Sequence, residues 1–493
     1  MKENVIMPNE RNKSSEQRKY LLELQFLRND TFIRRKRTLY AIISVFFGTY
    51  FTLVFYPGIL YGDSIQRWFA VMQILAGVYN HDFSEIVSHL SITPVFFMAL
   101  LYLFTFSFAA FTLVQAVFFF FSSFLMIDKF VRHSKPVVIV LFIFCPIFYA
   151  FSIYHEMSVG CVIGINFGLL LLLNEKLMYF KNWKITRKIS YAVWLLACYY
   201  VAFGFRQNAL TIFPVIVMVS IYLYQKYKDR LLLILQIGCV CFSMFFVSLF
   251  PSLLGINVLD GSSYGLAWEI LSIIQKMPEE KQVQYSDYLD FIADGYTVSA
   301  LAVNPAESSN VNVIWGPLGE NSLPIPYNAV QIRRKYFNLA FTETSYFLKT
   351  KRYFIGGILG IREPLVDDEY PYNWHDAMNN FGMVDNYLRY LFVLSYHKFH
   401  EIIPLFRIPW IWFCIGLVFV VWQFIKTGKG YSFGSLALYL LSVFYYAAFL
   451  INTQSFEFRY FFPSFYYMFI VLADSVAMIL YKLFSRLRKK ETT

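Results

Sequence analysis

The chain has 493 residues, of which 58% are hydrophobic and only 15% are charged, and its mean hydropathy is +0.49. Soluble domains carry about 25% charged residues, so the composition excludes a soluble enzyme, a disordered chain and a disulfide-stapled secreted domain. The net charge of +11 does not indicate a nucleic-acid partner, because positive charge collects in the cytoplasmic loops of membrane proteins. The composition therefore predicts an all-α, polytopic membrane protein.

Ten apolar stretches have close to the roughly 20 residues that a helix needs to cross a bilayer. They are 38–56, 108–127, 136–154, 157–173, 189–205, 209–224, 231–254, 403–424, 431–452 and 460–480. An eleventh stretch, 91–107, is apolar but shorter, and the distribution of charge decides whether it crosses.

Six segments between or beyond these stretches hold 28 of the 43 Lys and Arg residues. All six fall on one side of the membrane if 91–107 does not cross, whereas the first opposes the other five if it does. Short basic loops prefer the cytoplasm. The sequence therefore predicts ten crossings, both termini in the cytoplasm of a cell-membrane protein, and 91–107 as a juxtamembrane or re-entrant helix in the outer leaflet.

This topology divides the chain into five parts. They are a basic cytoplasmic N-terminal segment (1–37), a transmembrane region (38–254) with a first exterior loop (57–90) and a juxtamembrane helix (91–107), an exterior loop subdomain (255–402), C-terminal transmembrane helices (403–480) and a cytoplasmic tail (481–493). The exterior subdomain has 17 acidic and 11 basic residues. Its pattern favours helices at 265–276, 279–293 and 327–349, separated by turns.

Three polar residues stand near the exterior ends of the predicted spans. Asp63 follows the Pro-Gly pair that ends the first span, and Glu156 lies in a very short turn between two spans. Both carboxylates would face one exterior vestibule, where each could act as a general base or metal ligand. His89, the first polar residue before the juxtamembrane helix, is a candidate substrate contact. Ordinary loop roles remain open for all three.

Two arginines, Arg206 and Arg459, also lie at exterior span ends, against the positive-inside trend. The planar guanidinium group suits bidentate binding of phosphate. The alternatives are snorkelling to lipid headgroups and local ion pairs with Glu156 or Glu457.

Several short motifs resemble the GT-C superfamily of integral-membrane glycosyltransferases, in particular a poorly characterised bacterial branch. The motifs are Tyr56-Pro57-Gly58, Asp63-Ser64, Arg206-Gln207-Asn208, Trp268-Glu269-Ile270-Leu271-Ser272 and Phe458-Arg459-Tyr460-Phe461-Phe462-Pro463. Two departures stand out: His89 and Pro94 are separated where relatives have His-Pro, and His155-Glu156 stands where relatives often have Lys-Asp.

The resemblance implies a GT-C-like transferase of polysaccharide biosynthesis, which moves a sugar from a polyprenyl-phosphate carrier to a glycan or lipid acceptor of the cell envelope. It implies a catalytic role for Asp63 and Glu156, which could share a divalent cation. It also implies substrate contacts, which are His89, Arg206, Asn208, Glu269, Glu457, Arg459 and Tyr460. The alternatives are a polysaccharide polymerase or ligase, a transporter or flippase of lipid-linked sugars, and a non-catalytic assembly partner.

Overall fold

A computed structural model of the chain describes residues 15–56, 62–83, 86–88, 91–107, 109–154, 156–258, 262–289, 329–366, 386–427, 429–451 and 456–491. In these ranges the secondary structure is helical apart from one pair of two-residue strands and an isolated bridge. The all-α prediction is therefore confirmed for the described part of the chain.

Among the described residues, eight helical segments are long and apolar enough to cross a membrane. They belong to α1 (Ser15–Val54), α4 (Ala109–Phe130), α8 (Ile185–Phe205), η3 (Gln207–Ile212) with α9 (Phe213–Tyr227), α10 (Arg230–Leu253), α19 (Pro409–Thr427), α20 (Lys429–Ile451) and α21 (Phe458–Glu491). The chain is thus a multi-pass membrane protein by length and composition of its helices.

Two further apolar segments are bent. The first consists of α5 (Lys135–Phe144) and α6 (Pro146–Tyr154), which meet at 60°. Pro146 explains this break, because proline has no N–H to donate to the preceding turn. The second consists of α7 (Glu156–Leu172) and η2 (Glu175–Asn182), which meet at 57°. If each pair is one crossing, the described helices give the ten spans that the sequence predicts.

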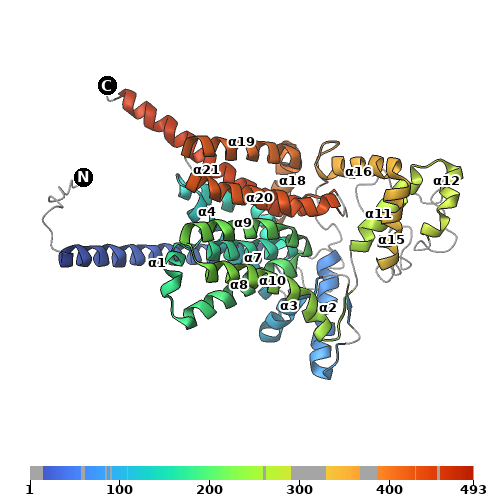
Figure 1. Ribbon diagram of the computed structural model, residues 1–493, viewed down its shortest axis with the longest axis horizontal. Coiled ribbons are helices and arrows are strands. Elements are labelled where there is room, and N and C mark those ends of the chain that lie inside the picture. Colours follow the sequence, from blue (N-terminus) through green and yellow to red (C-terminus); the bar gives the residue numbers. More distant parts are fainter. Residues whose placement is uncertain are drawn as a thin grey trace.

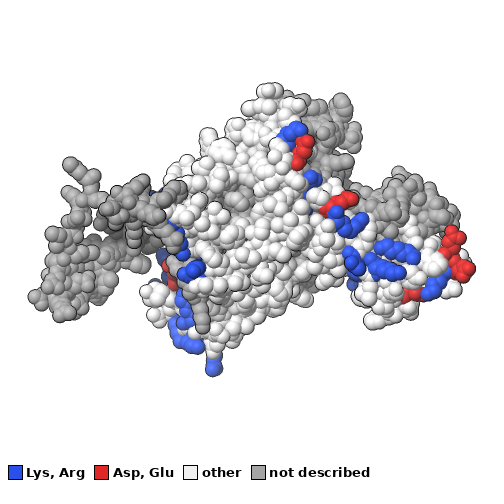
Figure 2. All heavy atoms as spheres, turned by 90° about the horizontal axis from the view of Figure 1, so that it is seen from above, with Lys and Arg blue, Asp and Glu red and all other residues white. Residues whose placement is uncertain are grey.

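The helices form an elongated bundle with distinct ends (Figure 1). The N-terminal end of α1 and the C-terminal end of α21 lie at one end, and a separate helical unit lies at the other. On the face that Figure 2 shows, a broad middle band carries almost no charged side chains among the described residues, and the blue and red atoms lie toward its ends. This is the surface that a bilayer requires, since charged groups at its centre are costly. The side of the membrane on which each end lies stays a prediction.

The predicted juxtamembrane helix is α3 (Ile92–Thr105), a 14-residue apolar helix. At 1.5 Å per residue it is about 21 Å long, shorter than the roughly 30 Å hydrocarbon core. It packs on α2 (Gly62–Asn80) through a small core separate from that of the bundle, which contains Trp68, Val71, Ile74, Val95 and Met98. The parallel strands β1 (Val87–Ser88) and β2 (Asn257–Val258) join the segment before α3 to the segment after α10.

The unit at the far end, here called the end unit, comprises the described residues 262–289 and 329–366. Its elements are α11 (Ser262–Gln275), α12 (Glu279–Gln284), η4 (Ser286–Leu289), α15 (Ala329–Thr342) and α16 (Thr344–Ile358). The stretch 327–349, expected as one helix, instead contains a break at Glu343, and the second helix continues to Ile358.

The last helix of the predicted exterior subdomain is α18 (Tyr387–Ile402), and it packs against the bundle. The Asn386 side-chain amide donates to the Val54 carbonyl at 2.9 Å, and the Tyr149 hydroxyl donates to the Phe392 carbonyl at 3.2 Å. A short turn, η7 (Pro404–Arg407), follows, so the next span begins at Pro409 rather than at residue 403.

A stripe of glycines brings α7 close to α8. Gly160, Gly164 and Gly168 lie four residues apart, on one face of α7. A Cβ at Gly164 would lie 2.5 Å from the Ala202 backbone nitrogen, and one at Gly160 would overlap the Phe205 ring. Small residues at this spacing allow close packing of membrane helices. The stripe thereby fixes the end of α8 that carries Arg206.

Candidate functional site

Arg206 and Arg459 meet at one aromatic ring. Arg206 follows the last residue of α8, and its Cζ lies 4.8 Å from the centroid of the Tyr460 ring and 5.7 Å from that of Phe449. Arg459, in the first turn of α21, has its Cζ 5.1 Å from the same Tyr460 ring. The structure therefore brings together two arginines that are far apart in the sequence. We call Arg206, Glu457, Arg459 and Tyr460 the arginine cluster.

The first turn of α7 borders this cluster. The Ser158 hydroxyl donates to the Arg459 carbonyl at 3.2 Å, and Gly160 lies against Phe205, the residue before Arg206. Glu156 begins α7, two residues before that hydrogen bond, but its side chain lies outside the described residues. The backbone thus brings the segment that carries Glu156 to the arginine cluster.

Arg459 has a carboxylate partner within the cluster. Its Nε lies 2.5 Å from Oε2 of Glu457, and both side chains are largely buried. The backbone around Glu457 is held by Val366, whose N–H donates to the Phe456 carbonyl at 2.8 Å and whose carbonyl accepts from the Phe458 N–H at 3.0 Å. The structure therefore contains one of the local ion pairs that the sequence left as an alternative to phosphate binding.

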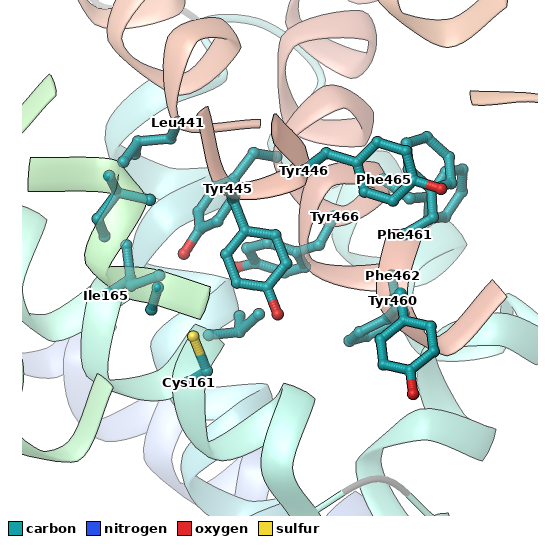
Figure 3. Packing of buried hydrophobic residues seen from close by; sticks show 14 of the residues in the cluster. Cys161, Ile165, Leu441, Tyr445, Tyr446, Tyr460, Phe461, Phe462, Phe465 and Tyr466 are labelled. Atoms are coloured by element: carbon teal, nitrogen blue, oxygen red, sulfur yellow. The ribbon is translucent and has the colours of Figure 1, made fainter. Parts of the chain in front are cut away.

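Arg206 differs from Arg459 in this respect. Its side chain is half-buried and makes no ion pair with any residue that the structure describes. Its neighbours are the two aromatic rings, together with Tyr445 and Cys161, with which it interacts electrostatically. Figure 3 shows Tyr445 and Tyr460 with their hydroxyl groups pointing the same way, and Cys161 is in the same packed region. A guanidinium in such surroundings is costly unless an anion compensates it.

Two other predicted substrate contacts occupy different places. Asn208 lies in η3, in the turn after Arg206, and its carbonyl accepts from the Thr211 hydroxyl at 2.7 Å. Glu269 is fully buried in the end unit, where its carboxylate accepts hydrogen bonds from Tyr336 at 2.8 Å and from Lys351 at 2.9 Å. These bonds give Glu269 a structural role, and its contact with substrate stays a prediction.

The predicted base and cation ligands are only partly located. Asp63 lies in the first turn of α2, but its side chain, like that of Glu156, is outside the described residues, and His89 is entirely outside them. Their catalytic, substrate and metal roles therefore stay predictions. In the described part of the chain there is no group of three or more His, Cys, Asp and Glu residues that could hold a metal ion.

Sequence reasoning missed one buried cation near the predicted first motif. Arg389 of α18 is 1% exposed, and its Nη1 donates to the Tyr56 carbonyl at 3.4 Å. Its backbone N–H donates to the Asn386 side-chain oxygen at 2.8 Å, so Asn386 caps the helix. An Asn directly before a helical pattern is a start signal, and it could have revealed α18.

Comparison with known proteins adds no relative to this description, since neither a family model, nor a curated protein, nor a solved structure matches the chain.

Proposed function

We propose that the chain is a membrane glycosyltransferase of the GT-C type, which transfers a sugar from a polyprenyl-phosphate carrier to a glycan or lipid acceptor at the predicted exterior face. One observation carries this proposal. Arg206 presents a half-buried guanidinium, flanked by aromatic rings and without an ion-pair partner among the described residues, between the end of α8 and the start of α21.

The phosphate of a polyprenyl carrier fits this position chemically. It supplies an anion for Arg206, which has no ion-pair partner among the described residues, and its prenyl chain supplies an apolar group that belongs in the bilayer. When the bond to the sugar breaks, negative charge grows on the leaving phosphate, so a fixed cation stabilises the transition state more than the ground state. Arg459, which pairs with Glu457, adds a second cation beside the Tyr460 ring. Asp63 would accept the proton of the acceptor hydroxyl.

The test measures binding of a short-chain polyprenyl-phosphate analogue to the full chain in nanodiscs. We expect Arg206→Gln to weaken binding by at least about tenfold, because the variant loses one or two charge-assisted hydrogen bonds to the phosphate. Arg206→Lys should weaken it less, because lysine keeps the charge but loses the planar fork. The midpoint of thermal unfolding without ligand should stay the same or rise, since the substitution removes a half-buried charge that has no ion-pair partner among the described residues.

Arg187→Gln is the matched control. Arg187 also lies over an aromatic ring, with its Cζ 4.1 Å from the Trp183 centroid, but near the opposite end of α8. The variant Arg187→Gln should leave binding of the analogue unchanged. Unaltered binding in both Arg206 variants, or a large loss of stability in Arg206→Gln without ligand, would show that Arg206 is a structural residue.

A further inference from the structure

The end unit contains a second pair of cations on one aromatic ring. Arg362, which follows α16, has its Cζ 3.5 Å from the centroid of the Tyr353 ring. Lys276, the residue after α11, has its Nζ 4.8 Å from the same centroid. Both cationic groups therefore lie close to one ring, and the positive charge of Arg362 acts on Lys276.

The backbone fixes Arg362 in place. Helix α16 ends in a turn at Gly360, whose φ is +68°, and the Ile361 N–H donates to the Gly356 carbonyl at 2.9 Å. The Leu365 N–H donates to the Arg407 carbonyl at 2.8 Å, which ties this turn to the segment before α19. A Cβ at Gly356 would lie 3.2 Å from two side-chain carbons of Arg362, so glycine there leaves room for the arginine stem.

Neither cation has a carboxylate partner among the residues that the structure describes. Glu269, on α11, the helix that Lys276 directly follows, is bonded to Lys351 and Tyr336. Glu363 is exposed and makes no ion pair with a described residue. Burial, and then the positive charge of Arg362, lower the pKa of Lys276 to about 8. Two neighbouring cations without a carboxylate partner among the described residues are an arrangement that an anion stabilises.

We propose that Lys276, Arg362 and Tyr353 form a binding site for a phosphate-bearing anion, separate from the arginine cluster. A phosphate has oxygens for both cations at once, and the fork of Arg362 can bind two of them. The Tyr353 ring lies 6.4 Å from the ring of Phe456, the residue before Glu457. The site therefore borders the arginine cluster and is positioned to hold a phosphate group of the acceptor, although its existence does not rest on the proposed transfer reaction.

The test uses the full chain in phosphatidylcholine nanodiscs and glycerophosphoglycerol as the probe, with binding followed by ³¹P line broadening. We expect the double variant Lys276→Gln/Arg362→Gln to weaken binding by at least about tenfold. The matched control is Arg334→Gln/Arg352→Gln, which removes two exposed cations from the same unit and should retain binding. Equal binding by the wild type and the Lys276/Arg362 variant overturns the proposal, as does an equal loss in the control.

A second arm separates the two sources of such a phosphate. If a lipid headgroup is the ligand, nanodiscs that contain phosphatidylglycerol will compete with the probe in the wild-type chain. If the ligand is a phosphate outside the bilayer, the lipid composition will have no effect. The variant Arg206→Gln should retain probe binding, so failure of this proposal is distinguishable from failure of the proposed transferase.

The pH dependence provides an independent readout. The charge of a phosphodiester does not change between pH 7 and pH 10, whereas Lys276 loses its proton above about pH 8. Probe binding should therefore fall as the pH rises through 8. Because arginine stays charged, Lys276→Arg should bind the probe equally at both ends of this range. A flat profile for the wild type would show that Lys276 does not contact the anion.

Discussion

At the scale of single residues, the arginines of the cluster differ in whether a described residue compensates their charge. Arg459 has Glu457 at 2.5 Å, whereas Arg206 has only aromatic and weakly polar neighbours among the described residues. Removing one partner of a buried ion pair leaves an uncompensated charge, which is more costly than removing both. The two arginines should therefore respond differently to substitution.

For the ion pair, we expect Glu457→Gln to destabilise the protein by about 3–5 kcal/mol, because Arg459 then lacks its counter-charge in a buried site. Glu457→Gln combined with Arg459→Met should recover much of this loss. The measurement is thermal unfolding in nanodiscs. Glu401→Gln is the control: Glu401 pairs with Lys398 at 2.6 Å, but both side chains are exposed, so its loss should hardly change stability. An unchanged unfolding midpoint in Glu457→Gln would mean that the ion pair contributes nothing to stability.

For the predicted base, Asp63→Asn should reduce sugar transfer by about 10²–10⁴-fold, the usual contribution of a general base. Asparagine keeps the size of aspartate and can still accept a hydrogen bond at the start of α2, so the unfolding midpoint should not change. The measurement compares the envelope glycans of cells that express the wild type or the variant. Undiminished glycan modification would remove Asp63 from catalysis and favour a transporter or an assembly role.

At the scale of elements, the glycine stripe of α7 sets the position of α8. A side chain at Gly164 would press on the backbone of Ala202, which cannot rotate away as a side chain can. We expect Gly164→Ala to lower stability by about 1–3 kcal/mol through overpacking and to weaken binding of the carrier analogue, since α8 carries Arg206. Gly238→Ala on α10 is the control, because nothing lies within 4 Å of its Cβ position. Equal stability of the two variants would contradict this role.

The predicted spans agree with the described helices because the length of an apolar run alone decides whether a segment can cross a bilayer. The same criterion fails for α2 and α18, which are helical because one face of each packs on a neighbour: α2 packs on α3, and α18 packs on the bundle. Their sequences mix polar and apolar residues, so a search for apolar runs passes over them. The break at Glu343 also depends on partners, since Lys281 donates to that carboxylate at 3.0 Å.

The candidate site, like the set of helices, could be predicted from the sequence only in part. Arg206 and Arg459 stand out in the sequence because cations are rare at predicted exterior span ends, and the structure places both at Tyr460. The pairing of Arg459 with Glu457 was one of two alternatives. The Lys276–Arg362 pair gave no signal, because it forms only when the ends of α11 and α16 come together.

At the scale of the whole molecule, the charge distribution predicts which end faces the cytoplasm. In a cysteine-free background, Val283→Cys in the end unit, where Val283 is 73% exposed, should react with an impermeant maleimide added to intact cells. Ser134→Cys, in the turn between α4 and α5, should react only after the membrane is permeabilised. The reverse pattern would invert the predicted topology and place the arginine cluster on the cytoplasmic side.

The end unit is fastened to the last three membrane helices, and this has a consequence for biosynthesis. Lys351 donates to the carbonyl of Ile451, the last residue of α20, while Val366 bonds to Phe456 and Phe458 beside the start of α21. Because these partners follow residues 329–366 in the chain, residues 329–366 leave the ribosome before the groups that satisfy them are made. A nascent chain that stops before α19 therefore exposes an incomplete end unit to proteases and chaperones, so the cell can recognise a truncated product before it accumulates in the membrane.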